Sequence, residues 1–139
     1  VECPQLMRAL SKPGAKAPWT CSAVGKIFLA FSKPSAISQI INQAGFTQFT
    51  RKSIMDEASF SREIAKAKQI AFAVDDEENS EGLRCIASPI FDANSIVIGS
   101  LSVSGPSVRI EEQKLPNFGR VTVRTAKELT RALGGTWPS

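Results

Sequence analysis

Histidine and tyrosine are both absent from this chain of 139 residues. Histidine activates the nucleophile in Cys–His and Ser–His dyads, and it is the commonest metal ligand in proteins. Its absence removes the usual routes to a thiol or hydroxyl enzyme and most zinc sites. We therefore expect a domain with no catalytic residues, no metal site and no cofactor.

Cysteine is scarce, with residues only at positions 3, 21 and 85. Three widely spaced cysteines form neither a disulfide framework nor a zinc site, and they favour a reducing cytosol. There is no run of 18 or more apolar residues, and the mixed first ten residues do not resemble a secretion signal. The sequence therefore predicts a cytoplasmic protein without a membrane partner.

The charges that are present do not form a basic patch. Seventeen Lys and Arg are scattered among 13 Asp and Glu, for a net charge of +4. This distribution does not favour direct nucleic-acid binding by these residues. The length predicts one domain, and the start at Val1 rather than Met suggests a fragment or a processed chain.

Hydrophobic periodicity predicts an α+β domain. Helices are expected at residues 20–31 with Thr20 as a possible cap, from Pro34 to Gly45, at 55–71 and at 111–133. Strands are expected within 70–79, at 83–91 and at 96–104, with a turn at 92–95. Gly25 inside the first helix indicates a close approach by another segment, because glycine costs about 1 kcal/mol there relative to alanine.

The last two strands predict a hairpin with one polar face. With a turn at 92–95, Cys85 should pair with Ser102, and Leu83 with Ser104. Side chains alternate between faces, so Cys85, Ser102 and Ser104 should share a face with Ser100 and, nearer the turn, apolar Phe91, Ile96 and Ile98. The opposite face should be aliphatic, formed by Ile86, Ile90, Val97, Leu101 and Val103, and Pro89 should lie at a local sheet edge.

Two interpretations of the polar face remain open at this level. Small hydroxyls and a thiol can line a pocket for a small polar ligand, but Ser can also face water and Cys85 can be a small core residue. A nucleophilic Cys85 is disfavoured, since no histidine exists and Arg84 should point to the other face. The acidic run 75–78 is most simply a solvated turn, although Asp75 could accept hydrogen bonds from a ligand.

Several stretches resemble the IclR family of bacterial transcriptional regulators. "VDDEENSEGLRCIASPIFD" and "GSLSVSGPSVR" look like the signature of that family's C-terminal effector-binding domain. "APWTCSAVGKIFLAF" resembles its "PLH-TA-GK-LLA" stretch, with Trp19 and Cys21 as variations. The resemblance covers about residues 14–134, and "GFTQFT" and "RTAKELTRALGG" most resemble the branch that represses allantoin and glyoxylate utilisation.

The resemblance implies a GAF-like (PAS/profilin-like) fold, which is a curved antiparallel sheet with flanking helices. It also implies a DNA-binding winged helix-turn-helix, N-terminal to this fragment and absent from it. The opening helix and first strands of the usual effector domain are expected to be absent as well. Operator DNA would then be contacted through the absent module, and the domain would self-associate to a dimer or tetramer.

In the branch named above, the effector pocket is built by a Gly-Ala backbone pair, an Asp, a Cys and two Ser. The positions that match in this sequence are Gly14, Ala15, Asp75, Cys85, Ser102 and Ser104. The resemblance thus implies a sensor domain of a regulator, expected to be a repressor, that binds a small oxo or hydroxy acid such as glyoxylate or pyruvate. The alternatives are an oligomerisation domain without a ligand and a small-acid or thiol enzyme.

Overall fold

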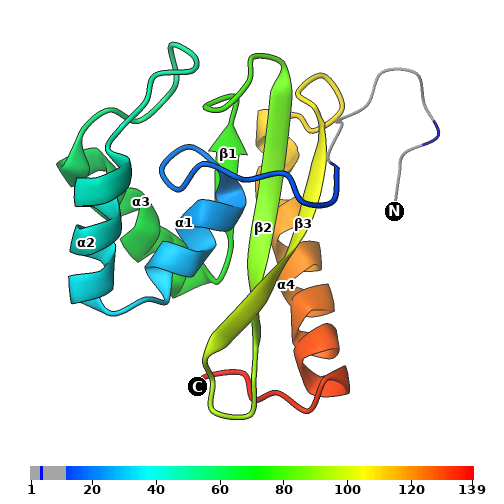
Figure 1. The fold of residues 1–139 in the computed structure, drawn as a ribbon. Coiled ribbons are helices and arrows are strands. Elements are labelled where there is room, and N and C mark those ends of the chain that lie inside the picture. The colour runs from blue at the N-terminus through cyan, green and yellow to red at the C-terminus, as the bar shows by residue number, and fades with distance from the viewer. Residues whose placement is uncertain (1–3, 5–11) are drawn as a thin grey trace.

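A computed structural model describes residue 4 and residues 12–139 of the chain (Figure 1). Within them, the order of elements is α1 (Ala23–Ala30), α2 (Pro34–Ala44), α3 (Glu57–Ile70), β1 (Ala73–Asp76), β2 (Leu83–Phe91), β3 (Val97–Pro106), the 3₁₀ turn η1 (Glu112–Lys114) and α4 (Leu115–Ala132). The predicted α+β class is confirmed.

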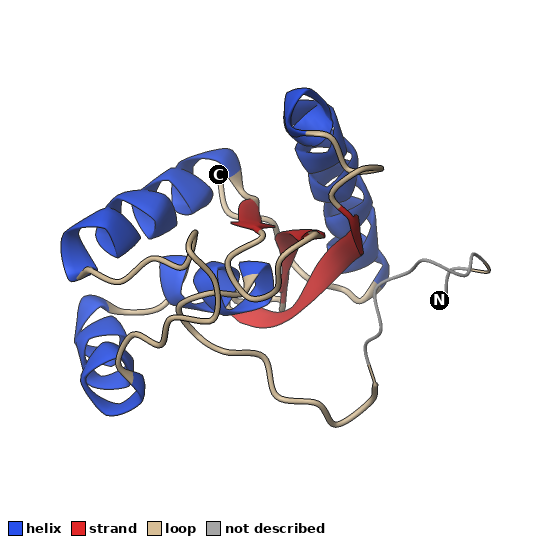
Figure 2. Ribbon diagram, turned by 90° about the horizontal axis from the view of Figure 1, so that it is seen from above, coloured by secondary structure: helices blue, strands red, loops and turns tan. Residues whose placement is uncertain are grey.

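The strands form an antiparallel sheet in the order β1-β2-β3. Helix α1 packs on all three strands and on α3, while α4 packs on β2 and β3. Viewed from above, α1 and α4 lie on opposite sides of the sheet (Figure 2). None of the described helices is long and apolar enough to cross a membrane.

The helix ends follow from capping chemistry. The Asp56 carboxylate accepts a hydrogen bond from the Ser59 N–H at 2.8 Å, and Pro34 occupies the first turn of α2. Helix α1 begins later than predicted, because its cap is Ser22, whose hydroxyl accepts from the Gly25 N–H at 3.0 Å. The expectation that Thr20 caps this helix was therefore wrong.

The predicted hairpin register was wrong by two residues. Cys85 lies opposite Ser104 rather than Ser102, and Ala87 lies opposite Ser102. One residue of the shift arises at the turn, since Phe91 lies opposite Val97 rather than Ile96, and the other at an irregularity at Ile90/Phe91, where β3 accommodates one extra residue between Gly99 and Val97. A shift of two preserves the alternation, so Cys85 still shares a face with both serines.

Near the turn the shift is only one residue, which reverses the predicted face assignments. Val97 lies opposite Phe91, so it belongs to the Cys85 side rather than to the aliphatic side. Ile96 and Ile98 are exposed, and so is Val103. The predicted apolar lining near the turn is therefore reduced to Phe91, whose ring makes edge contacts with Phe31 and Trp137.

The central strand is buried on both faces. On the α1 side, Ala87 joins a core cluster with Ile27 and Phe60. On the α4 side, Ile86 is fully buried, as predicted for the aliphatic face. Pro89 follows the last β1–β2 pair, Ala73 opposite Ala87, so the expected local edge is present.

Candidate functional site

Three of the predicted site residues form one row across the sheet. Asp75 in β1 lies directly opposite Cys85 in β2, which lies opposite Ser104 in β3. In the next row on the same face, Ser102 lies opposite Ala87. Directly opposed side chains in an antiparallel sheet have Cβ atoms about 4.5–5.5 Å apart, so the polar groups form one contiguous surface.

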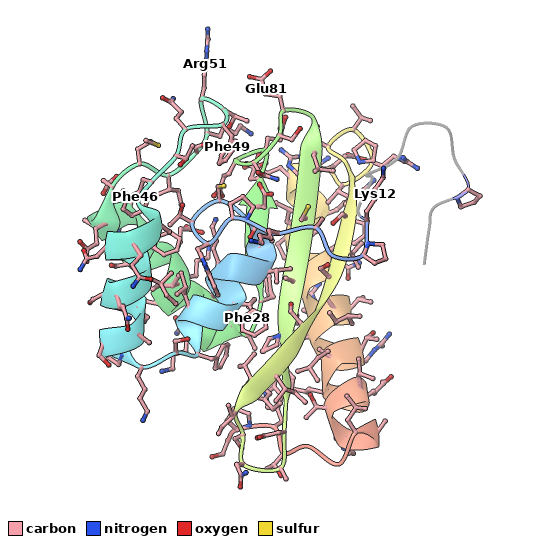
Figure 3. The ribbon with its side chains drawn as sticks, viewed as in Figure 1. Lys12, Phe28, Phe46, Phe49, Arg51 and Glu81 are labelled. Carbon is pink, nitrogen blue, oxygen red and sulfur yellow. The ribbon has the colours of Figure 1, made fainter. Side chains whose placement is uncertain are left out.

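A cavity of about 440 Å³, here called the α1 cavity, lies over this surface. Its walls are the sheet, the first turn of α1 and the loop that precedes α1, which crosses β2 and β3 in Figure 3. Its size falls within the usual range for small-molecule pockets. The lining residues are Lys12, Ala15, Lys16, Ala17, Pro18, Ser22, Ala23, Val24, Asp75, Asn79, Leu83, Cys85, Ser102 and Ser104.

Five of the six predicted residues line this cavity, and Gly14 does not. Gly14 precedes the lining residue Ala15 and has a φ of +84°, a conformation that favours glycine. Sequence reasoning missed Lys12, Lys16 and Asn79. The two lysines flank the Gly-Ala pair in the sequence, which was a usable signal, whereas nothing local indicated Asn79.

The first turn of α1 is held close to the preceding loop. The Ser22 hydroxyl donates to the Pro18 carbonyl, and a Cβ on Gly25 would lie 2.5 Å from the Trp19 carbonyl oxygen. The predicted close approach at Gly25 is therefore confirmed. No acidic residue occurs in the first turn of α1, and Ala23 and Val24 of that turn line the cavity, so the positive end of the helix dipole lies at the cavity wall.

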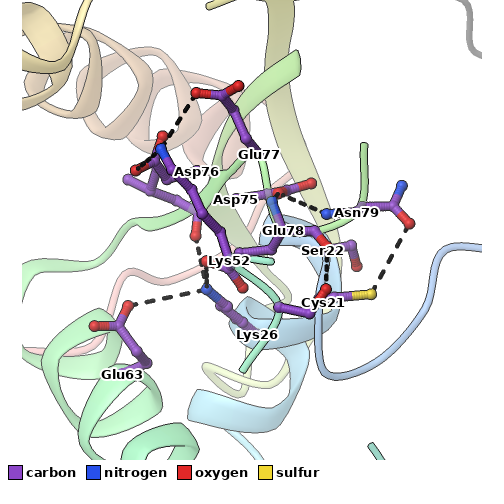
Figure 4. Close-up of polar contacts among 12 residues, drawn as sticks. Cys21, Ser22, Lys26, Lys52, Glu63, Asp75, Asp76, Glu77, Glu78 and Asn79 are labelled. Carbon is purple, nitrogen blue, oxygen red and sulfur yellow. Dashed lines mark hydrogen bonds and ion pairs between the residues drawn. The ribbon is translucent and has the colours of Figure 1, made fainter. Parts of the chain in front are cut away.

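Asp75 is oriented by the turn that follows β1 (Figure 4). Its Oδ1 accepts hydrogen bonds from the backbone N–H groups of Glu78 at 2.8 Å and Asn79 at 3.3 Å. The residue is only 2% exposed, and burial raises the pKa of Asp75 despite these hydrogen bonds and the charge of Lys26. Its carboxyl group is therefore a fixed polar group on the floor of the cavity.

The acidic run is not a solvated turn, which corrects the simplest interpretation of the sequence. Glu78 is buried and accepts from Lys26 Nζ at 2.6 Å. Asp76 accepts from Arg84 Nε at 2.5 Å, and Glu77 accepts from the Gly82 N–H at 2.8 Å. The cations arrive from other elements, so the acids fix the turn in place. Arg84 points away from the cavity, as predicted, and also donates to the Ile110 carbonyl.

The two described thiols are poor nucleophiles. Burial raises the pKa of Cys85, and burial together with the charges of Asp75 and Glu78 raises the pKa of Cys21 to about 11. A thiol reacts as its thiolate, so both are held in the unreactive form at neutral pH. Among the described residues, no group of three or more possible ligands could hold a metal ion.

Comparison with known proteins identifies the family. The family described as "Bacterial transcriptional regulator IclR C-terminal" matches residues 1–131. The chain belongs to this family. It is 33% identical over 136 residues to the acetate operon repressor of Salmonella typhimurium, which covers 98% of this chain and 50% of that protein. The HTH-type transcriptional repressor AllR of Escherichia coli is also 33% identical, over 96% of this chain and 49% of that protein.

These relatives define the family without singling out one of its branches, because the two identities are equal. They are transcriptional repressors rather than enzymes, in agreement with the expected absence of catalysis. The chain spans about half the length of the curated relatives it matches.

Solved structures confirm the GAF-like IclR fold. The Thermotoga maritima IclR structure superimposes with a TM-score of 0.88 at 30% identity, over 96% of this chain and 54% of that one. The PobR inducer-binding domain from Acinetobacter, solved as a double mutant with 3-hydroxybenzoic acid, gives a TM-score of 0.78 at 25% identity. That match covers 84% of this chain and 69% of that one.

Proposed function

We propose that this chain is the small-molecule sensing domain of a bacterial transcriptional repressor. Its effector is a small oxo or hydroxy acid, such as glyoxylate or pyruvate, bound in the α1 cavity. The observation that carries the proposal is the row formed by Asp75, Cys85 and Ser104 beneath the first turn of α1. This arrangement offers a small acid both donors and an acceptor.

One end of the cavity suits a carboxylate. The first turn of α1 contributes a positive helix end, and Lys12 and Lys16 lie in the wall. The Cys85 thiol and the hydroxyls of Ser102 and Ser104 can donate hydrogen bonds without adding charge. The Gly14-Ala15 segment would contribute backbone N–H groups to the same anion.

Asp75 suits the other end of the ligand. A hydroxyl or the hydrate of an aldehyde can donate to a carboxylate, whereas a second ligand carboxylate would be repelled by it. A related inducer-binding domain, that of PobR, was solved with 3-hydroxybenzoic acid, which also combines a carboxylate with a hydroxyl. The α1 cavity should therefore prefer monoacids with an adjacent oxygen function.

Regulation of transcription would require parts of the longer protein outside this domain. We propose that a winged helix-turn-helix module, N-terminal to this domain, contacts operator DNA in the cytoplasm. The domain would assemble into a dimer or tetramer whose arrangement shifts when the effector binds, since a ligand that binds one arrangement better changes the populations of both. Missing first strands of the effector domain would belong to that longer chain.

Calorimetric titration with glyoxylate, pyruvate and lactate tests the proposal, with pyruvamide as the uncharged control. We expect saturable binding of the acids and none of the amide. At a concentration of 100 times the dissociation constant, an acid should raise the free energy of unfolding by about 2.7 kcal/mol.

Two results would replace the proposal with one of its alternatives. Absence of stabilisation by every short acid would leave an oligomerisation domain without a ligand. Steady conversion of an oxo acid to a product would instead indicate an enzyme.

A further inference from the structure

A second and larger cleft lies on the other side of β1, between α3 and the start of α4. Its volume is about 870 Å³, and it shares no lining residue with the α1 cavity. Its apolar lining comprises Ile54, Ala67, Ile70, Phe72, Ala73, Val74, Leu115 and Pro116. We call it the α3–α4 cleft, and its volume lies within the range of ligand sites.

The acids of the α3–α4 cleft are already matched by cations. Asp76 is bound by Arg84 at 2.5 Å and by Lys52 at 3.2 Å. Glu63 and Glu78 both face the buried Lys26 Nζ, at 3.9 Å and 2.6 Å. Each acid of the lining therefore has a cation within 4 Å, although Glu63 and Glu78 share the same one.

Two cationic side chains of the cleft, by contrast, have no acidic partner among the described residues. Lys66 lies on α3 and Arg120 on α4, and neither forms an ion pair with any residue that the structure describes. The third cation of the lining, Arg62, is hydrogen-bonded to the Ser59 hydroxyl at 2.9 Å. The cleft therefore carries net positive charge on the two helices that form its walls.

The cleft also contains a buried acceptor that is not used. Glu78 is 6% exposed, and its Oε2 has no hydrogen-bond partner among the described residues, although its Oε1 is bound by Lys26. A buried carboxylate oxygen without a partner is uncommon, because leaving it unsatisfied costs free energy. A hydroxyl donor placed in the cleft would satisfy it.

We propose that the α3–α4 cleft is a second ligand site, which takes an amphipathic hydroxy acid with an apolar body. The carboxylate lies between Lys66 and Arg120, the body covers the apolar lining, and a hydroxyl at the far end donates to Glu78 Oε2. This ligand is larger and more apolar than the short acids proposed for the α1 cavity. The two sites meet at the 75–78 turn, where the Asp75 carboxylate binds the Glu78 N–H.

Calorimetry on the intact chain with three naphthalene probes separates the contributions of the ligand's hydroxyl and of its carboxylate charge to binding. 6-Hydroxy-2-naphthoate carries all the proposed groups, 2-naphthoate lacks the hydroxyl, and 2-naphthamide lacks the charge. The hydroxy acid should bind with a stoichiometry of one, and about tenfold or more tightly than 2-naphthoate, as expected for a hydrogen bond to a charged acceptor. The amide should bind most weakly.

Matched variants test the location of the site. Lys66→Gln and Arg120→Gln should each weaken naphthoate binding by about two- to fivefold, as for partly exposed ion pairs. Lys68→Gln is the control, because Lys68 is exposed on the same helix but does not line the cleft. Cys85→Ala, in the α1 cavity, should leave the affinity for naphthoates unchanged.

Four results would overturn the proposal. They are the absence of saturable naphthoate binding, equal affinity with and without the hydroxyl, equal effects of Lys66→Gln and Lys68→Gln, and loss of naphthoate binding in Cys85→Ala. Sedimentation identifies the competing occupant: if the chain self-associates, and Arg120→Gln separates the copies while no naphthoate binds, the cleft is an interface between chains. Failure here leaves the proposed effector site untouched, because the two sites share no lining residue.

Discussion

Lys26 Nζ lies 2.6 Å from Glu78 Oε1, and both side chains are buried. Lys26 comes from α1, whereas Glu78 follows β1, so the pair joins two segments that are 52 residues apart. Lys26 also donates to the Val74 carbonyl at 2.8 Å. The pair thus anchors the turn that orients Asp75 beneath the α1 cavity.

Lys26→Met should destabilise the fold strongly, because it leaves Glu78 buried without its counter-ion. We expect a loss of about 3–5 kcal/mol in the free energy of unfolding, measured with denaturant. Lys52→Met is the matched control, since Lys52 pairs with acids at the surface and should cost at most about 1 kcal/mol. Equal losses in the two variants would show that the buried pair is not the anchor.

The sequence predicted this region only in part. Strand alternation placed Cys85 and the serines on one face correctly, because a period of two is a local property. The register could not be predicted from this alternation, because it also depends on where the turn closes and on the extra residue of β3 at Ile90/Phe91. Lys26 was overlooked, although a lysine within the largely apolar stretch 20–31 was itself a sign of a buried partner.

Cys85→Ala and Ser104→Ala should weaken effector binding without unfolding the domain. Each removes a small side chain from the α1 cavity, and loss of a hydrogen bond to a charged ligand costs about 1.5–3 kcal/mol, or roughly 10- to 150-fold in affinity. Ile86→Ala, on the α4 side, should instead cost about 2–5 kcal/mol of stability. Ligand titration and denaturant unfolding of all three variants measure both quantities.

Comparison of the alanine variants of Cys85 and its neighbour Ile86 tests whether Cys85 contacts the effector. Cys85 and Ile86 are adjacent but face opposite sides of β2. If their alanine variants gave the same pattern of stability and affinity, Cys85 would be a core residue rather than a ligand contact. Ser104 adds a second check, because the structure makes it, and not Ser102, the cross-strand partner of Cys85.

Asp75→Asn should become more stable relative to the wild type as the pH rises. Burial raises the pKa of Asp75 in the fold above its unfolded value of about 3.9. Its contribution to stability is therefore complete below that value and declines as the pH rises through the folded pKa. Denaturant unfolding of both proteins between about pH 3 and pH 7 measures the difference.

The adjacent Asp76 provides a control of opposite sign. Burial alone would raise the pKa of Asp76, but hydrogen bonds from Arg84 and Lys52 lower it overall. Its contribution is present above the unfolded pKa and is lost as the pH falls through the folded pKa. Asp76→Asn should therefore be less stable than the wild type at neutral pH and should approach its stability in acid. If the stability difference from the wild type changed with pH in the same way for Asp75→Asn and Asp76→Asn, the opposite pKa shifts assigned to the two residues would be refuted.

Gly25→Ala should destabilise the domain and weaken effector binding together. In a helix free of neighbours, alanine would be favoured over glycine by about 1 kcal/mol. Here the added Cβ would lie 2.5 Å from the Trp19 carbonyl oxygen and 2.7 Å from that of Pro18, which are backbone atoms and cannot rotate away. Pro18 lines the α1 cavity, so moving this segment changes the cavity wall.

Gly99→Ala is the control for that prediction, because a Cβ there meets only the Ile90 side chain at an ordinary 3.7 Å. We expect a small change in its unfolding free energy and none in affinity. Thermal unfolding and titration with pyruvate measure both effects. Gly25→Ala could instead be as stable as Gly99→Ala and bind pyruvate normally. In that case the loop before α1 would not be fixed by its contact with the helix, and the α1 cavity would lack the rigid wall that effector binding requires.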